Sequence, residues 1–155
     1  MAVIGSLMKT NMITVAPTAS VEEACRSMAR NEVGAVLVVE GETLRGILTE
    51  RDVVSRVVAE GKVPSETPVS DVATTELVTV EEATHVRDCA RTLRERQIRH
   101  LPVLRGSKPV GILSSRDFQA YLVEGLERII DQSRYEDALD KGYDPYDHLG
   151  GSYGK

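Results

Sequence analysis

The chain has 155 residues, of which 41% are hydrophobic and 28% are charged, as in a globular protein with a substantial core. Only 4% are aromatic, which argues against the stacking platforms that bind single-stranded nucleic acid. The net charge of -5 argues against nucleic acid or an anionic membrane as the main partner.

The N-terminal stretch MAVIGSLMKTNM lacks the basic region, apolar stretch and cleavage site of a signal peptide. No segment has the roughly 20 consecutive apolar residues of a membrane span, so we expect a cytoplasmic protein with no membrane partner. Cys25 and Cys89 lack the CxxC spacing of a zinc or redox site. They are predicted to be core thiols in a reducing compartment, and no metal site is expected.

The first part of the chain predicts a strand, a helix, two strands and a second helix. Ser20 and Glu23 have the spacing of a capping box at the start of the first helix. Gly41 lies in the turn between the second and third strands, which form a hairpin. The predicted elements are, in order, a strand at 13–15, a helix from 21, strands at 33–40 and 44–49, and a helix from 50.

The same order recurs sixty-five positions later without a gap. GILTERD at 46–52 falls on GILSSRD at 111–117. Further identical pairs in this register are Thr14 and Thr79, Val15 and Val80, Val21 and Val86, Arg26 and Arg91, Val38 and Val103, and Gly41 and Gly106. Such a register indicates two copies of one supersecondary unit, each too small to bury its apolar face alone. Residues 60–68 link the copies.

Residues 125–155 have no counterpart in the first copy. The stretch LERIIDQSRYEDAL has the spacing of an amphipathic helix, so the last helix of the second copy is expected to continue or restart beyond Gly125. The final stretch, DKGYDPYDHLGGSYGK, is predicted to be a polar tail. The alternative is that its tyrosines clamp a partner.

The repeated phrases ThrGluArgAsp and SerSerArgAsp allow two interpretations. Ser or Thr followed three residues later by an acid is a helix-start signature, so both phrases are explained as capping boxes. The glycine before each box fits a crowded strand position that has no room for a Cβ atom. The same residues also offer a carboxylate, a hydroxyl and free N–H groups beside an apolar strand, which is the outline of a nucleoside phosphate site. Capping and binding are compatible.

The chain thus contains two tandem units, and each closes on glycine, two apolar residues, Ser or Thr, two variable residues and Asp. These paired units resemble a CBS domain pair, also called a Bateman module. The resemblance covers about residues 4–124, and IRHLPVL at 98–104 is also typical of the family. It implies an α/β (α+β) fold in which two β-α-β-β-α repeats, at 1–63 and 64–124, pack as a pseudo-twofold pair. Residues 125–155 would form a third segment.

The resemblance implies a regulatory module that binds AMP, ADP, ATP, NAD or S-adenosylmethionine between the copies, with no obligatory cofactor. Asp52 and Asp117 would accept the ribose hydroxyls, while Thr49 and Ser114 would face phosphate. The resemblance implies further contacts to the nucleoside from the strand-start residues Thr14 and Thr79. The base pocket would be lined by Ala35, Val36, Leu101 and Pro102, and the candidates for phosphate contacts are Arg51, Arg99, His100 and Arg116. The alternative for His100 is a surface or interface histidine.

The two expected sites differ in charge. Glu50 follows Thr49, whereas Ser115 follows Ser114, so extra phosphate charge is expected to be accommodated more easily at the Asp117 site. Because phosphates in such pairs point toward the centre of the module, Arg99 and His100 are also expected to serve the nucleotide whose ribose the other copy holds.

No enzyme motif accompanies these sites. The sequence lacks a Walker A loop, a GxSxG elbow, a paired-His metal motif and a Cys/His nucleophile pairing. We therefore expect a sensor that acts on an unidentified protein in trans rather than an enzyme. A scaffold with vestigial clefts is the alternative. The family resemblance also implies a homodimer through helix faces, including the valine-rich stretch at 53–58.

Overall fold

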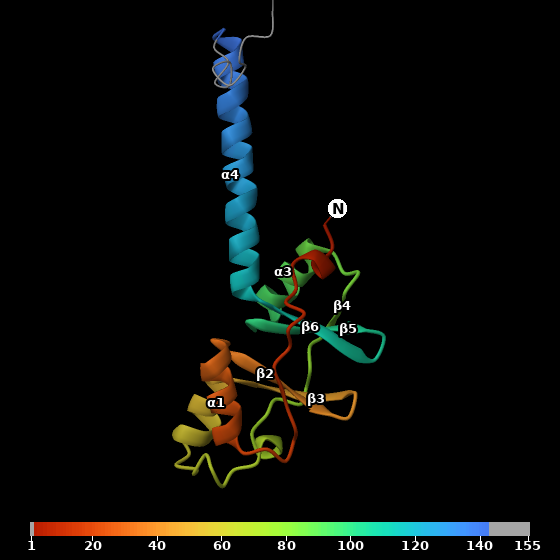
Figure 1. The fold of residues 1–155 in the computed structure, drawn as a ribbon, viewed down its shortest axis with the longest axis vertical. Helices are drawn as coiled ribbons and strands as arrows, with labels where there is room; N and C mark the ends of the chain where they lie inside the picture. Colours follow the sequence, from red (N-terminus) through yellow and green to blue (C-terminus); the bar gives the residue numbers. More distant parts are fainter. Residues whose placement is uncertain (1, 143–155) are drawn as a thin grey trace, which may run out of the picture. The chain divides into compact units, whose positions relative to one another are not determined.

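The computed structural model describes residues 2–142, which belong to two compact units, Met1–Asp117 and Phe118–Lys155. The first unit contains two three-stranded sheets, one from each half of the sequence repeat (Figure 1). The second unit contains most of one long helix. None of the described helices is long and apolar enough to cross a membrane.

Both repeats have the predicted order of elements. In the first repeat these are β1 (Thr14–Val15), α1 (Val21–Asn31), β2 (Ala35–Glu40), β3 (Thr43–Thr49) and α2 (Glu50–Val53). In the second they are β4 (Val80–Glu81), α3 (Val86–Arg96), β5 (His100–Arg105), β6 (Lys108–Ser114) and α4 (Ser115–Asp140). After α2 the backbone continues as a π-helical segment, Val54–Val58. Helix α4 continues through Gly125 without a break, whereas most of the predicted tail lies outside the described residues.

Each sheet has its first strand parallel and its third strand antiparallel to the central one. The central strand β2 is buried on both faces because alternate residues point to opposite sides. Val36 and Val38 pack in the core beneath α1, whereas Ala35 and Leu37 pack with β3 and with Ile112 of the second repeat. The first repeat therefore buries one sheet face under its own helices and the other against its sibling.

Helix α1 illustrates how the sequence encodes its local structure. The Ser20 side chain accepts a hydrogen bond from Glu23 N, and the Glu23 carboxylate accepts one from Ser20 N, which confirms the predicted capping box. Val21, Ala24 and Met28 form the buried stripe of the helix. Glu32 ends the helix in the left-handed conformation, with φ 53°.

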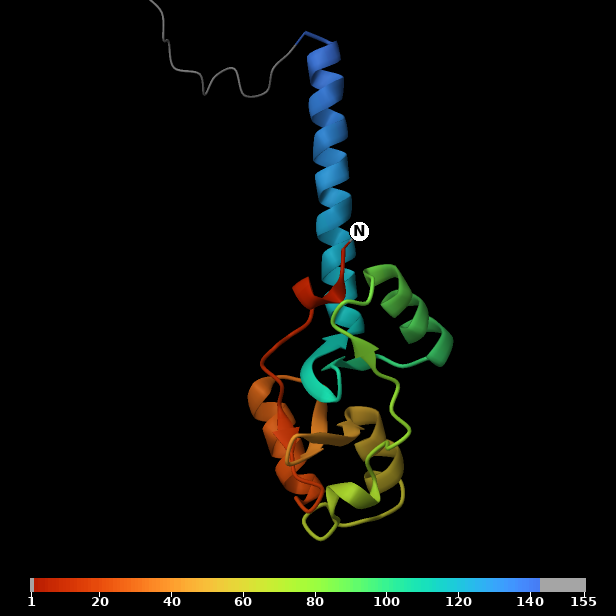
Figure 2. The same cartoon turned by 90° about the vertical axis from the view of Figure 1, so that its right-hand side faces the viewer.

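The segment that precedes each repeat pairs with the sheet of the other repeat. Residues 2–9 bond to the second repeat, where the backbones of Lys9 and Ile112 exchange hydrogen bonds of 3.0 and 3.1 Å. Residues 67–74 bond to the first, where Thr74 and Ile47 exchange bonds of 2.9 and 3.0 Å. Figure 2 shows the first of these segments passing from the second repeat to β1. These two crossing segments, 2–9 and 67–74, tie the repeats together.

The crossing segments explain the repeated glycine. A Cβ atom on Gly46 would lie 2.9 Å from the carbonyl oxygen of Thr74. One on Gly111 would lie 3.0 Å from the carbonyl oxygen of Lys9 and 2.7 Å from the sulfur of Met8. The expectation that no Cβ fits here is confirmed, and the obstruction is the backbone of the crossing segment.

We expect Gly46→Ala and Gly111→Ala each to lower the free energy of unfolding by about 1–3 kcal/mol, because a backbone carbonyl must move to admit the methyl group. Urea unfolding followed by circular dichroism measures this change. Gly125→Ala is the matched control, since a Cβ there meets nothing within 4 Å. Wild-type stability in both strand variants would contradict the crowding explanation.

Candidate functional site

One cavity of about 790 Å³ lies within the first unit and is bordered by both repeats. Its walls come from α1, β2, α2 and Val54 in the first repeat, and from β5, β6 and the residues just after β6 in the second. Lys9, Asn11 and Ile13, at the end of the first crossing segment and beyond it, also line it. The volume is that of a small-molecule site rather than a packing defect.

One part of the cavity is apolar. It is lined by Ile13, Cys25, Met28, Ala29, Val33, Ala35, Leu37, Val53, Val54 and Ile112. Ala35 is a small residue in this wall, and the equivalent position of the second repeat holds the larger His100. The apolar wall beside β2 suits a flat apolar group.

The Asp117 carboxylate lies at the polar part of the cavity. Its Oδ2 accepts hydrogen bonds of 2.7 Å from both the backbone N–H and the hydroxyl of Ser114. Its Oδ1 has one ion-pair contact, at 3.7 Å, with the Nζ of the mostly exposed Lys9. Oδ1 therefore retains capacity to accept hydrogen bonds from a ligand, whereas Oδ2 holds the helix start.

Four further charged side chains line this cavity, and none of them forms an ion pair with another described residue. Across residues 2–142, no ion pair within 4.0 Å involves Arg99, Arg116, Glu32 or Glu50. Unpaired cations beside a cavity suit an anionic ligand group.

His100 lies among these charges. Burial lowers its pKa, and the neighbouring Arg99 and Arg116 also lower it, while Glu50 and Asp117 act in the opposite direction. The imidazole is therefore neutral at pH 7. It can donate one hydrogen bond and accept another.

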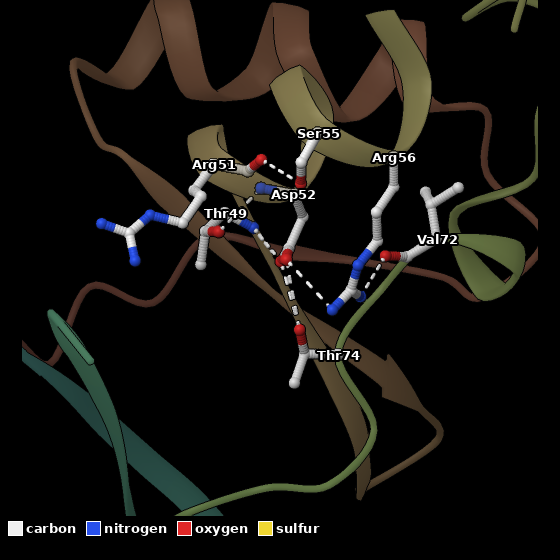
Figure 3. Close-up of polar contacts among 7 residues, drawn as sticks. All are labelled: Thr49, Arg51, Asp52, Ser55, Arg56, Val72 and Thr74. Carbon is white, nitrogen blue, oxygen red and sulfur yellow. Dashed lines mark hydrogen bonds and ion pairs between the residues drawn. The ribbon is translucent and has the colours of Figure 1, made fainter. Parts of the chain in front are cut away.

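Asp52, the equivalent of Asp117, is fully engaged by the protein (Figure 3). Its Oδ2 accepts a 3.0 Å bond from Thr49 N, and its Oδ1 accepts a 3.2 Å bond from the Thr74 hydroxyl and lies 3.7 Å from Arg56. Arg56 also donates a 2.8 Å bond to the carbonyl of Val72. This carboxylate is 7% exposed and joins α2 to the second crossing segment.

The cavity gathers part of the predicted site. The predicted residues that line it are Ala35, Arg99, His100, Ser114, Arg116 and Asp117. Those that do not line it are Thr14, Val36, Thr49, Arg51, Asp52, Thr79, Leu101 and Pro102. Val36 and Leu101 are fully buried in the core, and Arg51 extends away from Asp52 (Figure 3).

One feature of the cavity differs from the expectation. Glu50 lines the Asp117 cavity, so the expectation that its charge burdens only the Asp52 site is wrong. Arg99 and His100 line the cavity that contains Asp117 of their own repeat, and their expected contact with a nucleotide at the other copy's aspartate stays a prediction. Lys9, Asn11 and Gly34 were missed. A signal for Lys9 is present in the repeat register, because Lys9 is the counterpart of Thr74, which contacts Asp52.

The cysteines also differ from each other. Cys89 is fully buried, and burial together with Asp88 raises its pKa to about 11. Cys25 is partly buried and lines the cavity, and burial raises its pKa. Both are thiols, not thiolates, at neutral pH.

Comparison with known proteins decides the family. The sequence profile of the CBS domain matches residues 4–59 and 69–124. The chain belongs to the CBS domain family. The CBS domain-containing protein YhcV of Bacillus subtilis is 37% identical over 117 residues, which are 76% of this chain and 83% of that protein.

Two solved structures support the same fold. The crystal structure of the CBS domain NE2398 is 31% identical, with a TM-score of 0.75, and covers 79% of this chain and 98% of its own. The CBS domain protein PAE2072 of Pyrobaculum aerophilum, complexed with AMP, is 27% identical, with a TM-score of 0.72, and covers 79% and 97% of the two chains. The predicted pair of CBS repeats is confirmed.

The pKa of His100 predicts a pH dependence of stability. Its pKa is lower in the folded protein than its ordinary value of 6.5, so the unfolded chain binds the proton more readily. The contribution of His100 to stability is complete above pH 6.5 and is lost as the pH falls through the folded pKa. We expect ligand-free His100→Gln to lose less stability than the wild type between about pH 7.5 and pH 5.5.

Urea unfolding at the two pH values measures this difference. His85→Gln is the control, because His85 is exposed and does not line the cavity. Equal losses in the wild type and in His100→Gln would show that burial of His100 does not govern the acid response.

Proposed function

We propose that this CBS pair is a regulatory module that binds an adenosine nucleotide in the Asp117 cavity and acts on a partner protein in trans. The observation that carries the proposal is the Oδ1 of Asp117, which accepts no hydrogen bond from the described residues and lies in one cavity with an apolar wall, Arg99 and Arg116. A carboxylate accepts two vicinal ribose hydroxyls, the apolar wall suits an adenine face, and arginine suits phosphate.

The AMP complex of the Pyrobaculum protein supports an adenosine ligand. A compound that binds only the folded state at about 100 times its dissociation constant adds roughly 2.7 kcal/mol of stability. For a domain of this size, that corresponds to a melting shift of several degrees. AMP, ADP, ATP, NAD and S-adenosylmethionine form the test panel, with GMP and CMP as controls. No shift with any of the five at millimolar concentration would refute the proposal, and product analysis after incubation with ATP tests for catalysis.

We expect Asp117→Asn and Asp52→Asn to have different effects. Asp117→Asn removes the charged acceptor that faces the cavity and should weaken binding of the best panel ligand by more than about tenfold. Asp52→Asn disturbs contacts to Thr74 and Arg56 and should lower the free energy of unfolding by about 1–3 kcal/mol, leaving affinity within about twofold.

Calorimetry of both variants, read beside their urea unfolding curves, tests this contrast. Each aspartate is the matched control for the other, because both close a capping box at equivalent positions of the repeat. Equal loss of affinity in both variants would place a second functional site at Asp52.

We also propose a homodimer through exposed apolar helix positions. Val58 in the first unit is 65% exposed, and Leu126 in the second is 58% exposed. Light scattering at tens of micromolar should give twice the chain mass. Val58→Glu and Leu126→Glu, tested separately, should identify the contacting helix through loss of the dimer. A wild-type monomer at this concentration would contradict the proposal.

A further inference from the structure

The first repeat contributes the Glu50 carboxylate to the cavity of the second repeat's aspartate. Glu50 N donates a 3.0 Å hydrogen bond to the carbonyl of Gly34, and the Glu50 side chain lies over this glycine. A Cβ atom placed on Gly34 would be 3.2 Å from Glu50 Oε2 and 3.6 Å from His100 Cε1. Glu50 and His100 therefore approach the same point from different repeats.

This point adjoins the polar part of the cavity. His100 pairs with Ser114 across β5 and β6, and Ser114 holds the carboxylate of Asp117. A group that extends from a ribose at Asp117 past Ser114 toward His100 therefore meets Glu50. The counterpart of Glu50 in the second repeat is the uncharged Ser115.

The charges that line the cavity are balanced. Its cations are Lys9, Arg99 and Arg116, and its anions are Glu32, Glu50 and Asp117. Lys9 is the one cation of this set in ion-pair contact with a lining carboxylate, at 3.7 Å from Asp117. Arg99 and Arg116 attract one phosphate, whereas each further negative charge also meets the repulsion of Glu50.

We infer that Glu50 is a specificity-determining residue that limits the negative charge of the ligand's 5′ substituent. The cavity then accepts a monophosphate, or an uncharged or cationic group, in preference to a triphosphate. This inference rests on the proposed binding of an adenosine compound at Asp117 and names the phosphate class that the site selects.

Calorimetry of the full chain with AMP, ADP and ATP, at low salt and without Mg²⁺, tests the inference. In Glu50→Gln, we expect affinity to rise by about threefold for each added phosphate charge, so that the ATP to AMP affinity ratio rises about tenfold. Glu50→Ser, which copies Ser115, should give the same ratio. Melting temperatures without ligand establish that both variants are folded.

Glu60→Gln removes the same charge at an exposed position outside the cavity and should leave the ratio within twofold of the wild type. An unchanged ratio in both Glu50 variants overturns the inference, even if their affinity for all three nucleotides changes equally. The proposed function fails instead if the wild type binds neither these three nucleotides nor NAD nor S-adenosylmethionine, and this inference then fails with it. A gain that disappears at high salt supports the electrostatic origin.

Discussion

The reciprocal backbone pairing of the two crossing segments is the constraint on which the architecture of the first unit depends. Lys9 pairs with Ile112 and Thr74 pairs with Ile47, so each three-stranded sheet is extended at its third strand by the segment that leads into the other repeat. An isolated repeat would lose this edge and expose the inner face of its central strand. The two repeats therefore depend on each other for the burial of both apolar and backbone groups.

The same pairing places a side chain beside each of the two equivalent aspartates, Asp52 and Asp117. Thr74 donates to Asp52 at 3.2 Å, whereas Lys9 reaches Asp117 only at 3.7 Å through a flexible, mostly exposed side chain. Arg56 also contacts Asp52. One carboxylate is thus held by hydrogen bonds on both oxygens, while its counterpart retains an oxygen without a hydrogen bond from the described residues. The two copies of the motif therefore differ through the residues that the crossing segments bring to them.

Much of the fold was predictable because the repeat supplies each element twice. Helical spacing and the hairpin glycines recur in the second repeat, and the Ser20 and Glu23 capping box marks the start of α1 independently, so local patterns support one another. The cause of the Gly46 and Gly111 crowding was not predictable, since it depends on backbone from a distant segment. Continuation of α4 beyond Gly125 was one of two open alternatives, and the observed helix shows that an isolated glycine is tolerated.

The candidate site was harder to predict because neighbouring residues in a strand face opposite sides. Ala35 lines the cavity while Val36 enters the core, and His100 lines it while Leu101 is buried. The position of Glu50 has a different cause. Its sequence neighbours suggested the Asp52 site, but its backbone bond to Gly34 directs the side chain to the cavity of the other repeat.

A ligand in this cavity would contact three parts of the first unit at once. Lys9 and Asn11 come from the N-terminal region, Glu50 from the first repeat, and Asp117 from the second. Ribose hydroxyls bound to Asp117 Oδ1 would compete with Lys9 for the same oxygen, leaving that cation free to meet a phosphate instead. Binding would then replace the 3.7 Å ion pair between Lys9 and Asp117 by contacts of both residues with the ligand. Lys9 is also the residue whose backbone pairs the first crossing segment with β6. Occupancy of the cavity would thereby be coupled physically to the junction between the repeats, and under the proposed function this would be a means of reporting the ligand.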